Sequence, residues 1–206
     1  MSLLDNLASA VLQLALIAGI PFLIYFAWQK AFRKRTLQEV AQRAGLQLCD
    51  WRYAAYSLAF ALLGVTAIVI YSPSLEPLTR TGSAQRQFVG LGFTPLAIAK
   101  AFLYGAIQTG LTEELLFRGM IAGSLSRRLP FRWANFAQAF IFFLPHLLIL
   151  AFAAELWPIL PLVFVGGLVF GWVRIKSRSI IPSWLMHSSG NVAIALMVAI
   201  RTAPTS

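Results

Sequence analysis

The stretch Leu111-Thr-Glu-Glu-Leu-Leu-Phe-Arg-Gly119 places two glutamates and an arginine inside one of the most apolar parts of the chain. Charged side chains at membrane depth are costly, and they usually face a protein interior or a wet cavity and pair with one another. Glu114 and Arg118 are four residues apart with the acid first, which favours an ion pair along one helix face. Glu113 is turned about 100° away by the helical period. The rest of the chain must therefore enclose these groups and supply a partner for Glu113.

The composition is that of an integral membrane protein. Of 206 residues, 59% are hydrophobic and 12% are charged, with a mean hydropathy of +0.74, whereas soluble domains are roughly half apolar and about a quarter charged. The net charge of +10 comes from basic residues between apolar segments, without the basic aromatic face of nucleic-acid binders. We therefore expect the lipid bilayer as a partner and no nucleic acid. Cys49 is the only cysteine, which excludes an intrachain disulfide and a cysteine-based metal site.

Six segments are long enough to cross a membrane, because a spanning helix needs about 20 mostly apolar residues. They cover residues 8–28, 52–71, 94 to about 127, 133–152, 156–173 and 180–200. Residues 29–51 are basic and carry apolar side chains at helical spacing, which predicts an amphipathic helix on the membrane surface. Residues 72–93 are rich in turn-forming residues and predict an outer loop. Two G-x-x-x-G spacings predict close helix packing, and they are formed by Gly119 with Gly123 and by Gly167 with Gly171.

The predicted fold class is therefore all-α, a polytopic membrane helix bundle with about six transmembrane helices plus a cytoplasmic interfacial amphipathic helix. We expect one membrane domain, residues 1–206. Within it, residues 1–93 form the N-terminal spans, the interfacial helix and the outer loop. Residues 94–200 form a core that carries the polar motifs.

Basic residues predict the orientation, because Lys and Arg accumulate on the cytoplasmic side of a membrane. With the N-terminus outside, twelve of the 17 Lys and Arg side chains fall inside and four fall outside or at the outer boundary, while Arg118 lies within a span. The sequence thus predicts a multi-pass protein of the cell membrane whose N-terminus and C-terminus are both extracytoplasmic.

The remaining polar groups inside the spans recur at helical spacing. His146 follows Phe142 in Phe142-Phe-Leu-Pro-His146, and His187-Ser-Ser-Gly-Asn191 places a histidine and an asparagine on one helix face. At about 1.5 Å per residue from the cytoplasmic end, Glu113 and His146 lie roughly 21 Å deep, Asn191 roughly 20 Å and His187 roughly 14 Å. We therefore expect the three segments to converge, with Glu113 facing His146, His187 and Asn191.

A structural reading stays open for each of these groups. Glu114 and Arg118 are explained by an ion pair alone, and a histidine or asparagine in a span often serves as an interhelical hydrogen-bonding group. Glu113 is harder to explain in this way, since a second carboxylate beside a paired one has no obvious structural purpose. An unpaired carboxylate within reach of a water can act as a general base.

The three motifs together resemble the CPBP intramembrane proteases, a family that includes the type II CAAX prenyl endopeptidases and the bacterial Abi, or bacteriocin-immunity, proteins. That family carries E-E-x-x-x-R, F-x-x-x-H and H-x-x-x-N in this order on separate membrane helices. Here they stand as Glu113-Glu114-Leu-Leu-Phe-Arg118, Phe142-Phe-Leu-Pro-His146 and His187-Ser-Ser-Gly-Asn191. The resemblance covers about residues 94–191.

The resemblance implies an intramembrane endopeptidase that hydrolyses a peptide bond in a membrane-embedded or lipid-anchored polypeptide. Glu113 would activate the attacking water and His146 would help to hold it, while His187 and Asn191 would stabilise the oxyanion. Glu114 and Arg118 would form a supporting ion pair. The sequence does not specify the substrate, the cleavage site or an oligomeric state.

Two alternatives stay open. Glu113, His146 and His187 have the chemistry of a zinc site, but the sequence lacks H-E-x-x-H, the usual zinc-peptidase signature, and we expect no cofactor. A non-catalytic protein could also use these groups, as a bacteriocin self-immunity or scaffold protein or as a proton-coupled carrier. The absence of an internal repeat argues against a carrier.

Overall fold

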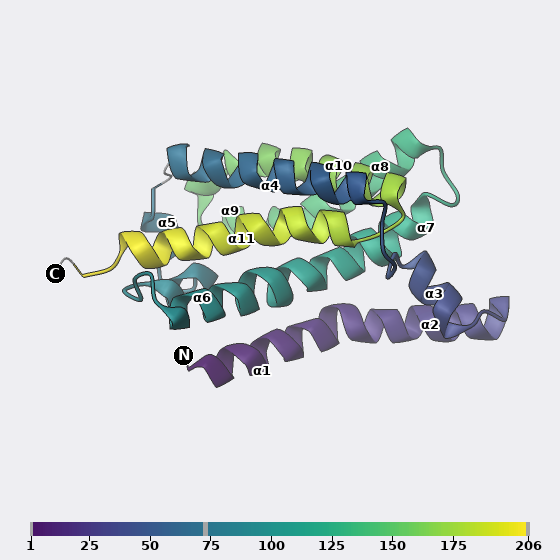
Figure 1. Ribbon diagram of the computed structural model, residues 1–206, viewed down its shortest axis with the longest axis horizontal. Coiled ribbons are helices and arrows are strands. Elements are labelled where there is room, and N and C mark those ends of the chain that lie inside the picture. The colour runs from purple at the N-terminus through teal and green to yellow at the C-terminus, as the bar shows by residue number, and fades with distance from the viewer. Residues whose placement is uncertain (1, 72–73, 205–206) are drawn as a thin grey trace.

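The computed structural model describes residues 2–71 and 74–204, and every regular element in this part of the chain is a helix (Figure 1). The first half contains α1 (Leu3–Gln13), the π-helical segment η1 (Leu14–Gly19), α2 (Ile20–Arg33), α3 (Leu37–Arg43), α4 (Trp51–Tyr71), α5 (Glu76–Thr79) and the 3-10 segment η2 (Ala84–Phe88). The acidic motif lies in α6 (Pro95–Phe102), the π-helical segments η3 (Leu103–Leu111) and η4 (Glu114–Ala122), and α7 (Gly123–Leu125). The chain continues through α8 (Phe131–His146), α9 (Ile149–Phe152), η5 (Ala154–Leu156), α10 (Ile159–Ser177) and α11 (Ile181–Arg201).

Among the residues that the structure describes, five helices are long and apolar enough to cross a membrane. They are Leu3–Arg33, Trp51–Ile70, Phe131–Ala151, Ile159–Ser177 and Ile181–Arg201. The sixth predicted span is the motif helix, which runs without a break from α6 through α7 but is too polar to belong to this set. The protein is an all-α, polytopic membrane helix bundle, as predicted.

The motif helix, formed by α6, η3, η4 and α7, is wider than an ordinary α-helix over most of its length. Its π-helical turns carry backbone bonds from residue i to residue i+5, and such turns are frequent at functional sites. Two threonine hydroxyls follow the same geometry, since Thr109 and Thr112 each donate to a carbonyl five residues earlier, at 3.0 Å and 3.4 Å. The helix passes through Gly110 without a break.

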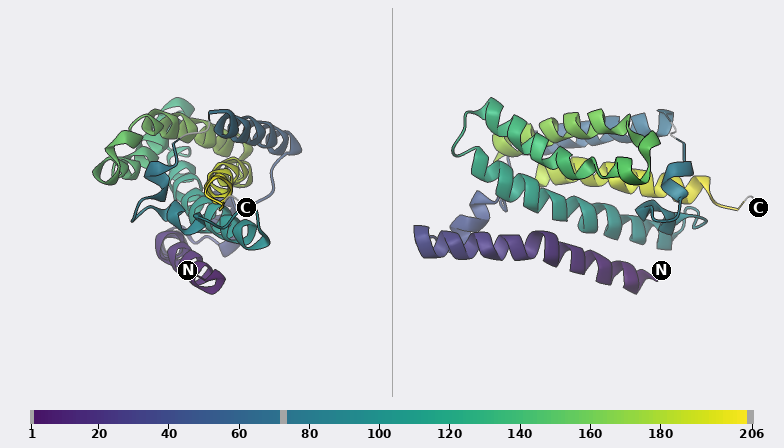
Figure 2. Two further views of the ribbon diagram at one scale, coloured as in Figure 1. Left: turned by 90° about the vertical axis from the view of Figure 1, so that its left-hand side faces the viewer. Right: turned by 180° about the vertical axis from the view of Figure 1, so that it is seen from behind.

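Helix α11 lies at the centre of the bundle, with α4, η3 and α10 packed around it (Figure 2). Close approach depends on glycine, because a Cβ added at Gly105 would lie 2.7 Å from the backbone nitrogen of Val192 on α11. On α10, a Cβ at Gly167 would lie 3.3 Å from the ring of Phe142, and one at Gly171 would overlap the Gln138 side chain. The second G-x-x-x-G spacing therefore packs α10 against α8.

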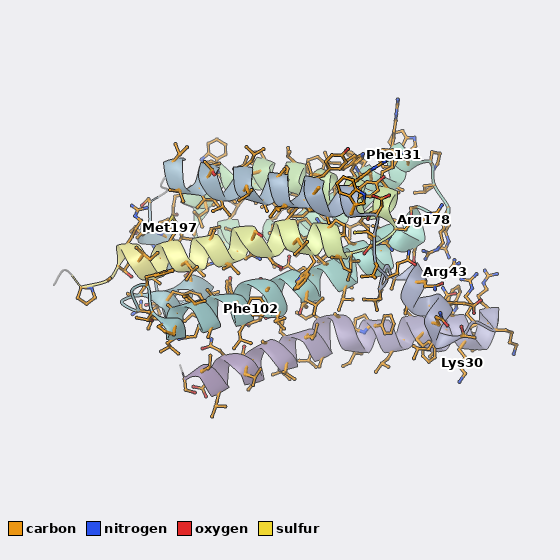
Figure 3. The ribbon with its side chains drawn as sticks, in the orientation of Figure 1. Lys30, Arg43, Phe102, Phe131, Arg178 and Met197 are labelled. Atoms are coloured by element: carbon orange, nitrogen blue, oxygen red, sulfur yellow. The ribbon has the colours of Figure 1, made fainter. Side chains whose placement is uncertain are left out.

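The amphipathic helix is shorter than predicted. The first spanning helix continues to Arg33, and only residues 37–43 of the predicted 29–51 form α3. Thr36 and Glu39 form a capping box that begins α3. Val40 and Ala44 are fully buried whereas Leu37 is exposed, so one face of the helix packs on the bundle. The end of the bundle that holds α3 also carries Lys30, Arg43 and Arg178, whereas the first turn of α1 lies at the opposite end (Figure 1, Figure 3).

The predicted outer loop contains two short helices, α5 and η2. Phe88 of η2 is fully buried and packs on Tyr104 of the motif helix and on Val198 of α11. This contact ties the segment to the core, which the turn-rich sequence did not predict. Residues 72 and 73, where the loop was predicted to begin, lie outside the described residues.

The first G-x-x-x-G spacing predicts a stability test. A Cβ at Gly119 would lie 2.9 Å from the backbone oxygen of Ala44, which cannot move without shifting the chain after α3. Gly119→Ala is therefore expected to destabilise the protein by about 1 to 3 kcal/mol, the usual range for overpacking. The measurement is the free energy of unfolding of the purified protein in detergent.

Gly64→Ala is the matched control, because nothing lies within 4 Å of a Cβ added there. The same change in α4 should be neutral or stabilising by up to about 1 kcal/mol, since alanine favours a helix over glycine. Equal effects of the two substitutions would contradict the packing assigned to Gly119.

Candidate active site

Glu114 and Arg118 form a fully buried ion pair. Both side chains are 0% exposed, and Arg118 Nη1 lies 3.3 Å from Glu114 Oε1. The guanidinium lies 3.9 Å from the ring centroid of Phe142 on α8 and 5.3 Å from that of Phe170 on α10. Aromatic faces attract a cation most strongly where water is excluded. The motif helix, α8 and α10 thus enclose the Arg118 side chain, and one of the residues in contact with it is Phe142 of the F-x-x-x-H motif.

His187 of α11 lies between the two glutamates. Its Nδ1 lies 3.1 Å from Glu114 Oε1, within hydrogen-bond distance, and its Nε2 lies 3.7 Å from Glu113 Oε2. The ring of Phe170 stacks on the imidazole with centroids 5.5 Å apart. A carboxylate that accepts Nδ1–H sets the orientation of a histidine ring and the role of its other nitrogen. Glu114 therefore directs Nε2 of His187 toward Glu113.

Glu113 has the surroundings of an accessible carboxylate. Its side chain is 24% exposed, against 0% for Glu114, yet its Oε2 atom is buried and takes no hydrogen bond from the described residues. A buried acceptor without a partner is uncommon in a folded protein. Glu114 Oε2 lacks a hydrogen bond as well, so the two adjacent glutamates differ in exposure and in partners, Glu114 being enclosed and paired with Arg118 while Glu113 is partly exposed and faces His187.

Asn191 lies one helical turn beyond His187, and its Nδ2 donates to Thr109 Oγ1 at 2.8 Å. The Thr109 hydroxyl donates in turn to the carbonyl of Tyr104 at 3.0 Å. Sequence reasoning missed Thr109, although its position four residues before Glu113 was a usable signal. Phe170 was missed as well, because no motif distinguishes it from the many other phenylalanines.

His146 is the predicted site residue that the structure connects least directly. Its Nδ1 lies 2.8 Å from the backbone oxygen of Phe142, and the two rings are 4.6 Å apart between centroids. Phe142 also packs edge-on against His187 at 6.1 Å. In the described part of the chain, no hydrogen bond or ion pair joins His146 to Glu113. His187 therefore faces Glu113 directly, as expected, whereas His146 is connected to His187 through the Phe142 ring.

The described residues do not fit a zinc site. No group of three or more His, Cys, Asp or Glu side chains among them is arranged to hold a metal ion. His146 and His187 both engage Nδ1 with a protein oxygen, so Nε2 is the nitrogen that each could offer to a ligand.

Comparison with known families gives one match. Residues 94–193 match the family model described as type II CAAX prenyl endopeptidase Rce1-like. The matched segment contains all three polar motifs, and its limits nearly coincide with those of the resemblance drawn from the motifs. Neither the curated proteins nor the solved structures gave a match.

The buried ion pair predicts strongly coupled substitutions. Arg118→Met leaves Glu114 buried without its cation, and breaking a buried pair in this way costs about 3 to 5 kcal/mol. Glu114→Gln combined with Arg118→Met removes both charges and should cost much less than Arg118→Met alone. The unfolding free energies of both single variants and the double variant in detergent measure this coupling.

The exposed pair of Glu76 and Arg80 is the control, because it has the same i, i+4 spacing in the sequence; Arg80 also pairs with the exposed Glu155. Neutralising Glu76 and Arg80 in the same way should change stability by about 0 to 1 kcal/mol, as for other solvent-exposed pairs. Additive effects at Glu114 and Arg118 would show that the two side chains do not stabilise each other.

Proposed function

We propose that this protein, whose residues 94–193 form a domain of the type II CAAX prenyl endopeptidase family, is an intramembrane endopeptidase. It hydrolyses a peptide bond in a membrane-embedded or lipid-anchored polypeptide by glutamate-activated attack of water. The observation that carries the proposal is the placement of His187, which contacts Glu114 through Nδ1 and faces Glu113 through Nε2. This arrangement leaves Glu113 without a hydrogen bond at Oε2 from the described residues, beside an imidazole oriented by Glu114.

Glu113 is the proposed general base. A water hydrogen-bonded to the Glu113 carboxylate transfers a proton to it as the water oxygen attacks the carbonyl carbon of the scissile bond. The proton on Glu113 then passes to the leaving nitrogen as the carbon–nitrogen bond breaks, so the glutamate returns to its ionised form. A base must lie within hydrogen-bond reach of the proton that it removes, and the Glu113 side chain is 24% exposed and takes no hydrogen bond at Oε2 from the described residues.

His187 and Asn191 are the proposed donors to the oxyanion. With both ring nitrogens protonated, His187 donates Nδ1–H to Glu114 and keeps Nε2–H for the oxygen that gains charge. Asn191 uses one amide hydrogen on Thr109 and has a second one available. Donors held in place before the reaction are worth more in a water-poor site than in bulk water. His146 is assigned to holding the attacking water, and Glu114 with Arg118 to holding His187.

The proposed reaction uses no cofactor. Every step is assigned to the side chains of the chain itself, because the sequence lacks the usual zinc-peptidase signature H-E-x-x-H. The five apolar spans make this a membrane protein. For its orientation, we assign the basic end to the cytoplasm and both termini to the outside, since Lys and Arg favour the cytoplasmic side.

Substitution of Glu113 tests the proposed base. Glu113→Gln keeps the size of the side chain but cannot take a proton, so we expect cleavage to fall at least about 100-fold, the lower end of general-base contributions. Asn191→Ala should lower the turnover number by about 100 to 1,000-fold, as loss of an oxyanion donor does elsewhere. Both are measured with purified protein in liposomes and a library of membrane peptides.

The controls separate chemistry from folding and from the rival functions. Gly64→Ala should cleave as the unsubstituted protein does, and metal-stripped protein should keep its activity. Equal cleavage by Glu113→Gln would contradict the role of Glu113, and loss of activity on metal removal would contradict the cofactor-free reaction. Solute uptake by these liposomes without any cleavage would favour a proton-coupled carrier, and neither activity would favour an immunity or scaffold protein.

The single cysteine tests the orientation. Cys49 lies between α3 and α4 at the basic end and is partly exposed, so the proposal places it in the cytoplasm. In intact cells it should react with a membrane-permeable maleimide and resist an impermeable one. A Ser2→Cys substitution in a Cys49→Ser background should react with both reagents, and the reverse pattern would invert the orientation.

A further inference from the structure

A cavity lies at the basic end of the bundle, and none of its lining residues belongs to the Glu113 site. Its volume is about 380 Å³. It is enclosed by the end of α2, the beginning and end of the α3 segment, and the end of the motif helix. The lining residues are Tyr25, Trp28, Gln29, Arg33, Arg35, Arg43, Ser124, Arg127 and Arg128.

The cavity holds positive charge that no carboxylate of its lining offsets. Arginine is the commonest lining residue, and no Asp or Glu is present. No ion pair formed by the described residues includes any of these arginines. The hydrogen bonds from Thr36, together with the charges of Arg35 and Arg43, lower the pKa of the nearby Glu39 carboxyl. Glu39 lies outside the cavity lining, and its Oε2 accepts from Thr36 in the α3 cap. Like charges held together in this way favour an anion between them.

Neutral acceptors hold Arg127 and Arg35 in place. Arg127 donates to the backbone oxygen of Arg43 at 3.2 Å and to the Tyr25 hydroxyl at 3.0 Å. Arg35 donates to Gln29 Oε1 at 2.9 Å. Burial, with Arg43 and Arg35 nearby, lowers the pKa of the Arg127 guanidinium. The side chains are thus oriented without being neutralised, which reduces the entropy lost when a ligand binds.

We propose that this cavity binds a phosphate group, as presented by the headgroup of an anionic phospholipid or by a soluble phosphate. The planar fork of arginine matches phosphate oxygens two at a time. A water molecule takes about 30 Å³ in the liquid, so the cavity has room for a phosphate together with the atoms attached to it. Basic pockets between membrane helices bind lipid headgroups in other proteins, and Trp28 lies here at the end of a span, where aromatic residues meet the interface.

A bound phosphate would join two separate parts of the chain. Arg33 and Arg35 follow the first span, whereas Arg127 and Arg128 follow the helix that carries Glu114 and Arg118. A ligand that binds only the folded protein stabilises it by RT ln(1 + L/Kd), where L is the free ligand concentration, so the unfolding temperature rises with ligand concentration. Binding is therefore measurable without any assay of cleavage, and its failure would leave the assignment of Glu113 untouched.

The test uses the purified full-length protein in uncharged detergent at low salt. The thermal midpoint is followed as dioctanoyl phosphatidylglycerol, dioctanoyl phosphatidylcholine or inorganic phosphate is added. The test variant is Arg33→Gln with Arg128→Gln, two exposed lining residues whose side chains make no hydrogen bond within the described residues. The control variant is Lys30→Gln with Arg132→Gln, which removes the same charge at the same end outside the cavity.

We expect the midpoint to rise with the logarithm of the anionic lipid concentration above Kd, to change little with the zwitterionic lipid, and to give an apparent Kd at least about tenfold weaker in the test variant. A tenfold change corresponds to about 1.4 kcal/mol, within the range for one hydrogen bond to a charged group. Competition by inorganic phosphate, or a rise with inorganic phosphate alone, would show the same site used by a soluble ligand. The proposal would be overturned if the apparent Kd weakened equally in the test and control variants, or if the thermal midpoint did not rise with either anion.

Discussion

The buried ion pair of Glu114 and Arg118 is the constraint on which the rest of the structure depends. Two charges with no exposure to solvent are tolerated only when they are paired and enclosed. The enclosure comes from Phe142 on α8, Phe170 on α10 and His187 on α11, so three helices must meet the motif helix at one level. The glycines that let α10 and α11 approach their neighbours make this meeting sterically feasible.

Glu113 gains its character from this enclosure. Glu114 uses one oxygen for both Arg118 and His187, and the imidazole held in this way faces the neighbouring glutamate. One residue apart along the chain, the two carboxylates differ in exposure and in partners. The ion pair thus serves as the support for a site whose open member is Glu113, and Asn191 with Thr109 completes the polar surface on α11 and the motif helix.

The sequence predicted what depends on composition and on local spacing. The length of the apolar segments predicted a bundle of membrane helices. The i, i+4 spacing of Glu114 with Arg118 and of His187 with Asn191 predicted which helix faces carry the polar groups. The sequence did not predict the π-helical turns, because apolar length and residue spacing do not distinguish i to i+5 bonds from the i to i+4 bonds of an α-helix. An estimate of depth does not give the direction of a side chain. It therefore did not predict that the Phe142 ring lies between His146 and His187. Thr109 and Phe170 act through contacts that no single segment reveals.

The protonation of His187 tests the central claim most directly, because the proposed site depends on a proton at Nδ1 held by Glu114. The measurement is the nitrogen-15 chemical shift of the histidine ring in labelled protein, assigned by His146→Asn since the chain has only two histidines. A protonated Nδ1 in the unsubstituted protein that is altered by Glu114→Gln is the predicted result. An unprotonated Nδ1, or the same shift in both proteins, would contradict the account.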